Sequence, residues 1–151
     1  MKIIDKLNEL NLQLPPTPLP AASYVTAVEI NGLLFISGQG PLIGPDPVFT
    51  GRVGIELTEA QGYAAAQLTA LNLLAVIESQ IGLDSVKSFV KLTGWVSSAP
   101  DFYRQHKVMD GASDLLMRVF GESGRHARCA LGASVLPFNL PVEADLVIAV
   151  R

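Results

Sequence analysis

Residues 24–37 read YVTAVEINGLLFIS, and this stretch decides how the chain starts its sheet. Two runs rich in β-branched and aromatic residues, 24–30 and 33–37, are joined by Asn31-Gly32. This dipeptide tolerates the two positive φ angles of a type I′ turn, which is the turn that matches the twist of paired strands. The segment therefore predicts an antiparallel β-hairpin.

The segment after the hairpin, residues 38–47, is dense in glycine and proline and predicts a loop before a short strand at 48–53. Its glycines at positions 38, 40 and 44 miss the spacing of a dinucleotide-binding loop by one residue. They also follow a hairpin strand without opening a helix directly. This pattern excludes a Rossmann site.

A helix is predicted from the capping box Thr58-Glu59-Ala60-Gln61 to about Ile81, with Gly82 placed for a left-handed C-terminal cap. Residues on one side of this helix are mostly small and apolar, as packing on a sheet requires. They are Ala64, Leu68, Leu71, Ala75 and Glu78. Residues 86–97 then predict a strand, because many of them are β-branched or aromatic.

A second helix is expected to open at Ser98-Ala99-Pro100-Asp101 and to end at Gly121. Its apolar stripe consists of Phe102, Met109, Ala112, Leu116 and Val119. Two further strands, 128–135 and 142–150, complete the chain.

The chain begins with a short amphipathic helix, in which Ile4, Leu7 and Leu10 recur at helical spacing. Four prolines among residues 14–20 then prevent further helix. We therefore divide the chain into a lead-in, residues 1–20, and one domain, residues 21–151.

These elements predict an α+β fold, a two-layer sandwich in which two long helices cover one face of a mixed six-stranded sheet. Strand residues 33–36 and 146–150 are apolar on both sides, so the uncovered face would expose a large apolar patch. Association of several copies into a closed ring is the expected way to cover it.

Composition narrows the class of function. The chain is 49% hydrophobic and 17% charged, and its net charge of −3 gives no general basic field of the kind that nucleic-acid binding requires. No apolar run is long enough to cross a bilayer, and the single cysteine, Cys129, cannot close an intrachain disulfide, so we expect a cytoplasmic protein. The two histidines, His106 and His126, form no metal-ligand pattern, and no metal site is expected.

Three charged residues stand in otherwise apolar strands, namely Arg128, Glu143 and Asp145. Strand alternation places Arg128 on a face with small residues and turns Cys129 to the other face. A guanidinium beside small residues suits a planar carboxylate, which it grips through two parallel hydrogen bonds. The alternative is that Arg128 and Glu143 form an ion pair without chemical function, either between strands of one chain or between subunits.

Several motifs in register resemble the Rid family, also called YjgF or L-PSP endoribonuclease. The C-terminal motifs are ARCA at 127–130, Leu136-Pro137, and VEAD at 142–145. Upstream, Tyr24 precedes SGQGP at 37–41 by thirteen residues. The likeness extends from about residue 20 to the end of the chain.

The resemblance implies the chorismate-mutase-like fold, assembled as a homotrimer with small-molecule sites between subunits. It also implies hydrolysis of reactive enamines and imines to 2-keto acids and ammonia, with no cofactor. Arg128 would hold the substrate carboxylate and Glu143 would position or activate water. Tyr24, Ser37 and the backbone of Gly38 would line the pocket.

This chain departs from the deaminating members of that family at three places. His106 stands where those members carry asparagine, so we include it among the expected substrate-binding residues. Ala130 replaces a cysteine, and residues 122–126 form an insertion before the arginine. Two alternatives stay open: a noncatalytic protein that binds a small carboxylate in the same cleft and, less favoured by the acidic charge balance, an endoribonuclease.

Overall fold

Strand β7, Val142–Val150, lies at the centre of a five-stranded sheet. Its antiparallel neighbours are β2 (Leu33–Gln39) and β5 (Val86–Ser97), and the edges are β1 (Ala27–Ile30) and β6 (Ala127–Ala133). Only β5 and β6 are parallel, because helix α3 (Gln105–Phe120) carries the chain between them. The sheet is therefore mixed, as predicted. The structure is a computed structural model and describes residues 1–151.

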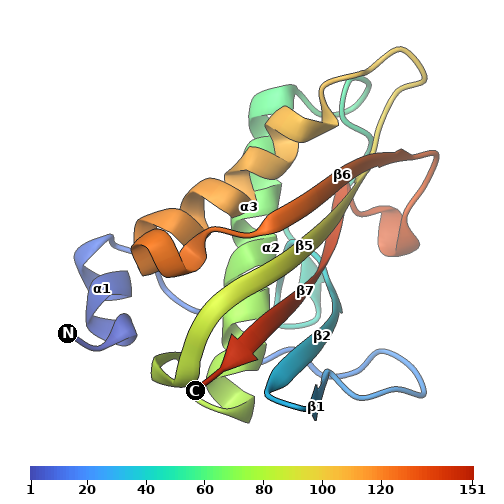
Figure 1. The fold of residues 1–151 in the computed structure, drawn as a ribbon. Coiled ribbons are helices and arrows are strands. Elements are labelled where there is room, and N and C mark those ends of the chain that lie inside the picture. Colours follow the sequence, from blue (N-terminus) through green and yellow to red (C-terminus); the bar gives the residue numbers. More distant parts are fainter.

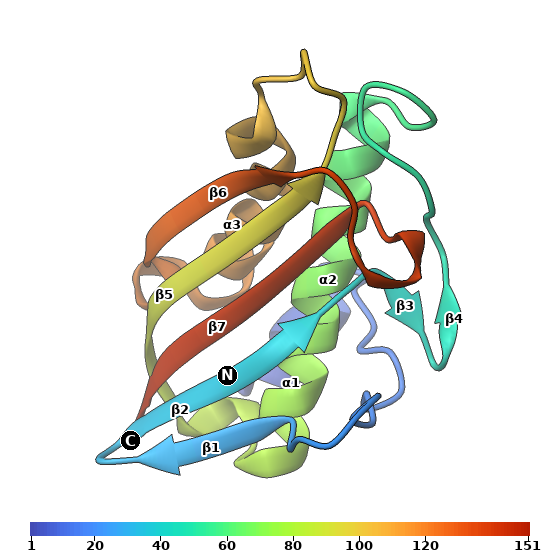
Figure 2. The same ribbon diagram turned by 90° about the vertical axis from the view of Figure 1, so that its right-hand side faces the viewer.

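Helices α2 (Glu59–Gln80) and α3 cover one face of the sheet and leave the other face open (Figures 1 and 2). The short helix α1 (Ile3–Glu9) packs beside α3, and its Leu7 is only 1% exposed and belongs to the main core. The first part of the lead-in, residues 3–14, is thus packed onto the domain.

The core lies between the sheet and the two long helices. Alternate residues of β7, namely Ala144, Leu146 and Ile148, are buried there. The second half of α2, residues 71–77, is buried on all sides because it contacts both the sheet and α3. By length and composition α2 is apolar enough to span a bilayer. Most of it is buried inside the fold, however, and the apolar side chains of a core helix account for this composition. The predicted stripe on α2 was misplaced, since Ala64 and Leu68 are only half-buried and Glu78 is exposed. The buried residues of the first half are instead Gly62, Ala65, Ala66, Thr69 and Ala70.

Local sequence signals placed two junctions correctly. Asn31 and Gly32 have φ angles of 50° and 76°, as the predicted type I′ turn requires. The capping box of α2 is complete, because the Thr58 amide donates to Gln61 Oε1 at 2.8 Å and the Gln61 amide donates to Thr58 Oγ1 at 3.1 Å. Gly82 has the expected positive φ of 78°.

Two predicted elements were wrong in extent. Helix α3 begins at Gln105 rather than at residues 98–101, because the Gln105 side chain donates to Ser98 Oγ and to the Phe102 carbonyl and holds the preceding segment as a turn. Residues 48–53 form no strand, since Gly51 and Gly54 adopt φ angles of 112° and 92° that strand backbone cannot use.

The sheet consequently has five strands instead of the six expected. The loop after β2 forms instead a separate ribbon of two very short strands, β3 (Leu42–Ile43) and β4 (Asp46–Pro47). The α+β two-layer architecture is nevertheless as predicted.

We predict that Gly111→Ala destabilises the fold. A Cβ atom at position 111 would lie 2.1 Å from the backbone oxygen of Tyr63 on α2, so the two helices would have to separate. In an exposed helix the same change stabilises by up to about 1 kcal/mol, whereas overpacking here should cost about 1–3 kcal/mol. Urea unfolding measures the difference, with the exposed Lys107→Ala of the same helix as control. A more stable Gly111→Ala variant would contradict the close helix contact.

Candidate functional site

A cavity of about 490 Å³ opens on the uncovered side of the sheet, where β2 ends and β7 begins. Four of the residues predicted for the site line it, namely Tyr24, Ser37, Gly38 and Glu143. The remaining lining residues are Ala21, Ala22, Pro137 and Phe138. The structure therefore brings four residues from three distant parts of the sequence into one cavity.

Hydrogen bonds fix the wall formed by the end of β2. The buried side chain of Asn72, on α2, donates at 2.9 Å to the carbonyls of both Gly40 and Leu42 and so holds the loop that follows the strand. Ser37 Oγ donates to the Val25 carbonyl at 2.7 Å. The Tyr24 hydroxyl accepts from the Ala21 amide at 3.2 Å, which ties this ring to the chain entering the sheet.

Glu143 occupies the floor of the cavity with a carboxyl group that makes no hydrogen bond or ion pair within the chain. It lies on the open face because its neighbours on β7, Val142 and Ala144, point into the core. Gly38 leaves room for it, since a Cβ atom at position 38 would lie 3.2 Å from Glu143 Cδ. Burial, and to a lesser extent the nearby Asp145, raises the pKa of Glu143 above 4.5.

A strained turn forms the opposite wall of the cavity. Phe138 and Asn139 have φ angles of 60° and 55°, which residues with a side chain rarely adopt. The Asn139 carbonyl accepts from the Gly51 amide at 2.8 Å, which anchors this turn to the loop before α2. The Phe138 ring is thereby presented at the cavity, largely exposed to solvent.

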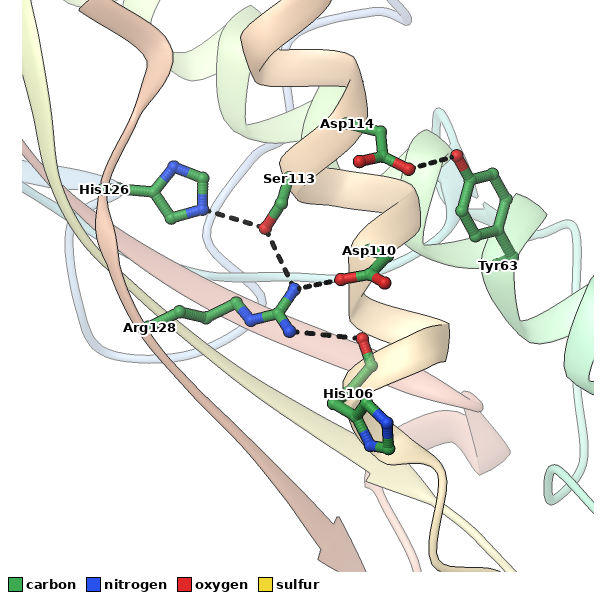
Figure 3. Close-up of polar contacts among 7 residues, drawn as sticks. All are labelled: Tyr63, His106, Asp110, Ser113, Asp114, His126 and Arg128. Carbon is green, nitrogen blue, oxygen red and sulfur yellow. Dashed lines mark hydrogen bonds and ion pairs between the residues drawn. The ribbon is translucent and has the colours of Figure 1, made fainter.

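Arg128 lies elsewhere, between edge strand β6 and helix α3 (Figure 3). Its Nη1 donates to Asp110 Oδ1 at 2.9 Å and to Ser113 Oγ at 3.1 Å, and its Nη2 donates to the His106 carbonyl at 3.2 Å. The side chain remains 21% exposed. A guanidinium has five N–H donors, so one hydrogen of Nη2 and the Nε hydrogen are left without a partner in the chain.

The alternative ion pair between Arg128 and Glu143 does not form within one chain. Their strands are separated by β5, and Arg128 faces the helices whereas Glu143 faces the open side. The partner of Arg128 is Asp110, eighteen residues earlier in the sequence. Cys129 is exposed and, as predicted, points away from the face that carries Arg128.

His106 contributes its backbone rather than its ring to the surroundings of Arg128. Its carbonyl accepts the hydrogen bond from Nη2, and its exposed imidazole extends away from the guanidinium (Figure 3). The predicted site residues therefore fall into two groups, one around Glu143 and one around Arg128.

Comparison with known proteins decides the relationship of this chain. Residues 5–148 match the family described as YjgF/chorismate mutase-like, putative endoribonuclease. The chain belongs to this family.

Individual relatives that are 30–42% identical to this chain support the assignment to the YjgF-like family. Protein TCP17 of Trypanosoma cruzi is 42% identical over 97% of this chain and 93% of its own length. The solved structure of Atu1372 from Agrobacterium tumefaciens, a protein of unknown function, is 39% identical with a TM-score of 0.92, covering 99% of this chain and 92% of that one. A putative endoribonuclease from Shewanella oneidensis is 30% identical with a TM-score of 0.96, covering 99% and 100% of the two chains.

Sequence reasoning missed the side chains that support both groups. The contacts of Asn72 with the distant Gly40 loop and the strain at Phe138 leave no local signal in the sequence. Asp110 and Ser113 lie one helical turn apart, and His126 lies two residues before Arg128 on the same strand face. Those spacings were visible, but a spacing within one element does not reveal which other element it meets.

We predict that Glu143→Gln changes the pH dependence of stability. Because the pKa of Glu143 is raised in the folded protein, ionising this carboxyl costs folding free energy. That cost is absent below the pKa of the unfolded chain, at about pH 4, and is complete once the pH exceeds the folded pKa. The variant should match the wild type at acidic pH and exceed it at pH ~7, by less than about 1 kcal/mol because the side chain is half-exposed.

Urea midpoints at the two pH values test this difference. Glu29→Gln removes an exposed carboxylate from β1 and is the matched control. If the wild type gains stability relative to Glu143→Gln as the pH rises, the Glu143 carboxylate is stabilised rather than penalised by its surroundings.

Proposed function

We propose that this protein hydrolyses reactive enamines and imines derived from 2-amino acids to 2-keto acids and ammonia. The observation that supports the proposal most directly is the unpartnered carboxyl group of Glu143 in a cavity, with its pKa raised. Such a group exchanges protons near neutral pH more readily than an exposed glutamate does.

Glu143 acts on water in this proposal. It takes a proton from the water molecule whose oxygen attacks the imine carbon and passes that proton to nitrogen, which gives a carbinolamine. It then takes the proton of the new hydroxyl group and passes it to the amine, so that the C–N bond breaks as the keto group forms and ammonia leaves. An imine is already electrophilic, so orientation and one proton carrier are enough for the reaction.

Arg128 binds the substrate carboxylate through the edge of its guanidinium that the chain leaves free. The two donors without a partner belong to Nε and Nη2, the adjacent nitrogens that grip a carboxylate through parallel hydrogen bonds. Asp110 and Ser113 occupy Nη1 at the other side and keep the group oriented.

The two groups of residues meet, in our proposal, at the junction between copies of the chain. Arg128 is on an edge strand, whereas the Glu143 cavity opens on the uncovered face, so one copy's edge can approach its neighbour's face. That face carries Val28, Phe35 and Leu131, which are 55%, 45% and 49% exposed. Burying such side chains favours a closed assembly, and we propose a trimer.

The surroundings of the cavity argue against the nuclease activity in the family's description. Glu143 and Asp145 place two carboxyl groups on the open face, where they would repel a phosphate backbone. A noncatalytic carboxylate-binding role uses the same Arg128 and is distinguished only by turnover.

We predict that substitutions separate binding from turnover. Arg128→Ala should weaken binding of a 2-keto acid such as pyruvate at least about tenfold, since hydrogen bonds to charged groups contribute roughly 1.5–3 kcal/mol. Glu143→Gln should leave that affinity within a few-fold and lower the rate by about 10²–10⁴. The assay follows keto-acid release while an amino-acid oxidase generates imine beside the protein.

Arg125→Ala is the control for lost positive charge, because Arg125 is exposed and pairs only with Glu122. A wild type that binds pyruvate through Arg128 but never accelerates imine hydrolysis would establish the noncatalytic role. If Arg128→Ala and Glu143→Gln both unfold, and neither changes pyruvate affinity or turnover separately, the two residues serve only the stability of the fold.

We predict that the site is shared between subunits and that two inactive variants complement each other. Arg128→Ala and Glu143→Gln chains, unfolded together in equal amounts and refolded, should form mixed trimers. Random assortment then gives about one quarter of junctions an intact Arg128 and an intact Glu143, and about that share of activity should return. Light scattering should report three times the mass of one chain.

Refolding each variant alone provides the control and should restore nothing. A monomer at micromolar concentration would contradict the shared arrangement. Mixed assemblies without activity would contradict it as well.

A further inference from the structure

Ser113 and His126 form a directed chain of hydrogen bonds that ends on Arg128. His126 Nδ1 lies 2.7 Å from the Gly124 carbonyl, and its Nε2 lies 2.9 Å from Ser113 Oγ (Figure 3). Ser113 Oγ in turn accepts from Arg128 Nη1 at 3.1 Å. The proposed reaction gives His126 no role, and it does not say what orients the Ser113 hydroxyl toward Arg128.

The direction of each bond follows from the chemistry of its atoms. A carbonyl oxygen only accepts, so the proton of neutral His126 is on Nδ1 and its Nε2 is an acceptor. The Ser113 hydroxyl must therefore donate to Nε2 and turn its lone pairs toward Arg128. Burial and the positive charge of Arg128 lower the pKa of His126, which keeps the ring neutral.

This arrangement does not suit Ser113 to nucleophilic attack. Its side chain is buried, with 8% of the residue exposed, and its lone pairs are directed at a guanidinium. His126 has no carboxylate behind it, only the Gly124 carbonyl. The two residues are arranged to orient a cation instead.

We propose that Ser113 and His126 are positioning residues that set the orientation of the Arg128 guanidinium for a carboxylate ligand. Asp110 and Ser113, the latter held by His126, accept from Nη1, and this leaves the Nε and Nη2 edge for the ligand. Asp110 neutralises the charge and the His106 carbonyl accepts from Nη2, and Ser113 adds the second acceptor on Nη1 that fixes the plane of the group. The proposal rests on the function assigned to Arg128 above.

The test measures pyruvate affinity and the tautomer of His126 in the full chain. Nuclear magnetic resonance of ¹⁵N-labelled histidine should show Nδ1 protonated and Nε2 bare at neutral pH. Ser113→Ala and His126→Phe should each raise the Kd for pyruvate by about three- to tenfold, and the double variant should do no worse than either, because both break one chain of bonds. His126→Gln keeps a side-chain oxygen that can accept from the Ser113 hydroxyl, so its affinity for pyruvate should be close to that of the wild type.

Tyr63→Phe is the matched control. It removes another hydrogen bond to α3, from Tyr63 Oη to Asp114 at 2.8 Å, at the residue next to Ser113 but unconnected to Arg128 (Figure 3). Its pyruvate affinity should equal that of the wild type. An equal loss in this control, or additive losses in the double variant, would overturn the positioning role.

Two further outcomes separate this proposal from the function on which it rests. A proton on His126 Nε2 in the wild type would overturn the chain of bonds whatever the activity. If the wild type binds no pyruvate, the proposed function fails. The positioning role is then tested separately by the rate at which the N–H hydrogens of the Arg128 guanidinium exchange with solvent. Faster exchange in Ser113→Ala than in Tyr63→Phe supports it, and equal exchange contradicts it.

Discussion

The alternation of side chains along β7 is the constraint on which the rest of the molecule depends. This strand is the centre of the sheet, and pairing on both sides with β2 and β5 fixes its register. Ala144, Leu146 and Ile148 must face the helices to complete the core, so Glu143 and Asp145 must face the open side. A carboxyl group is held in a half-buried cavity because the core next to it requires that register.

The same constraint keeps Arg128 and Glu143 apart in one chain. Arg128 pairs in register with Leu92 of β5, a core residue, and therefore shares the helix side of the sheet. No change of side-chain rotamer can bring it to the opposite face two strands away. If both residues serve one reaction, the second must come from another copy, and the apolar open face supplies the driving force for bringing copies together.

The sequence predicted the elements whose signals are local and left out those set by distant contacts. The Asn31-Gly32 turn and the Thr58 capping box depend on backbone angles and bonds within four residues, and both are present. The start of α3 was wrong because Gln105 turns back to bond Ser98 and Phe102. The partner of Arg128 was missed for the same reason, since Asp110 faces it only after α3 has packed on β6. The grouping of Tyr24, Ser37, Gly38 and Glu143 followed from resemblance, not from spacing.

The pairing of Arg128 with Asp110 also limits what kind of recognition this site can perform. The pair is neutral overall, so an arriving carboxylate gains little from net charge, and long-range attraction contributes little to its binding. What remains is the fork of two parallel hydrogen bonds at Nε and Nη2, which is strong only when the guanidinium plane is fixed. Recognition by geometry rather than by charge favours a small planar carboxylate over a phosphate. It also accounts for Asp110 and Ser113, which hold Nη1, the nitrogen that would not meet the proposed ligand, while the His106 carbonyl takes only one of the two hydrogens of Nη2.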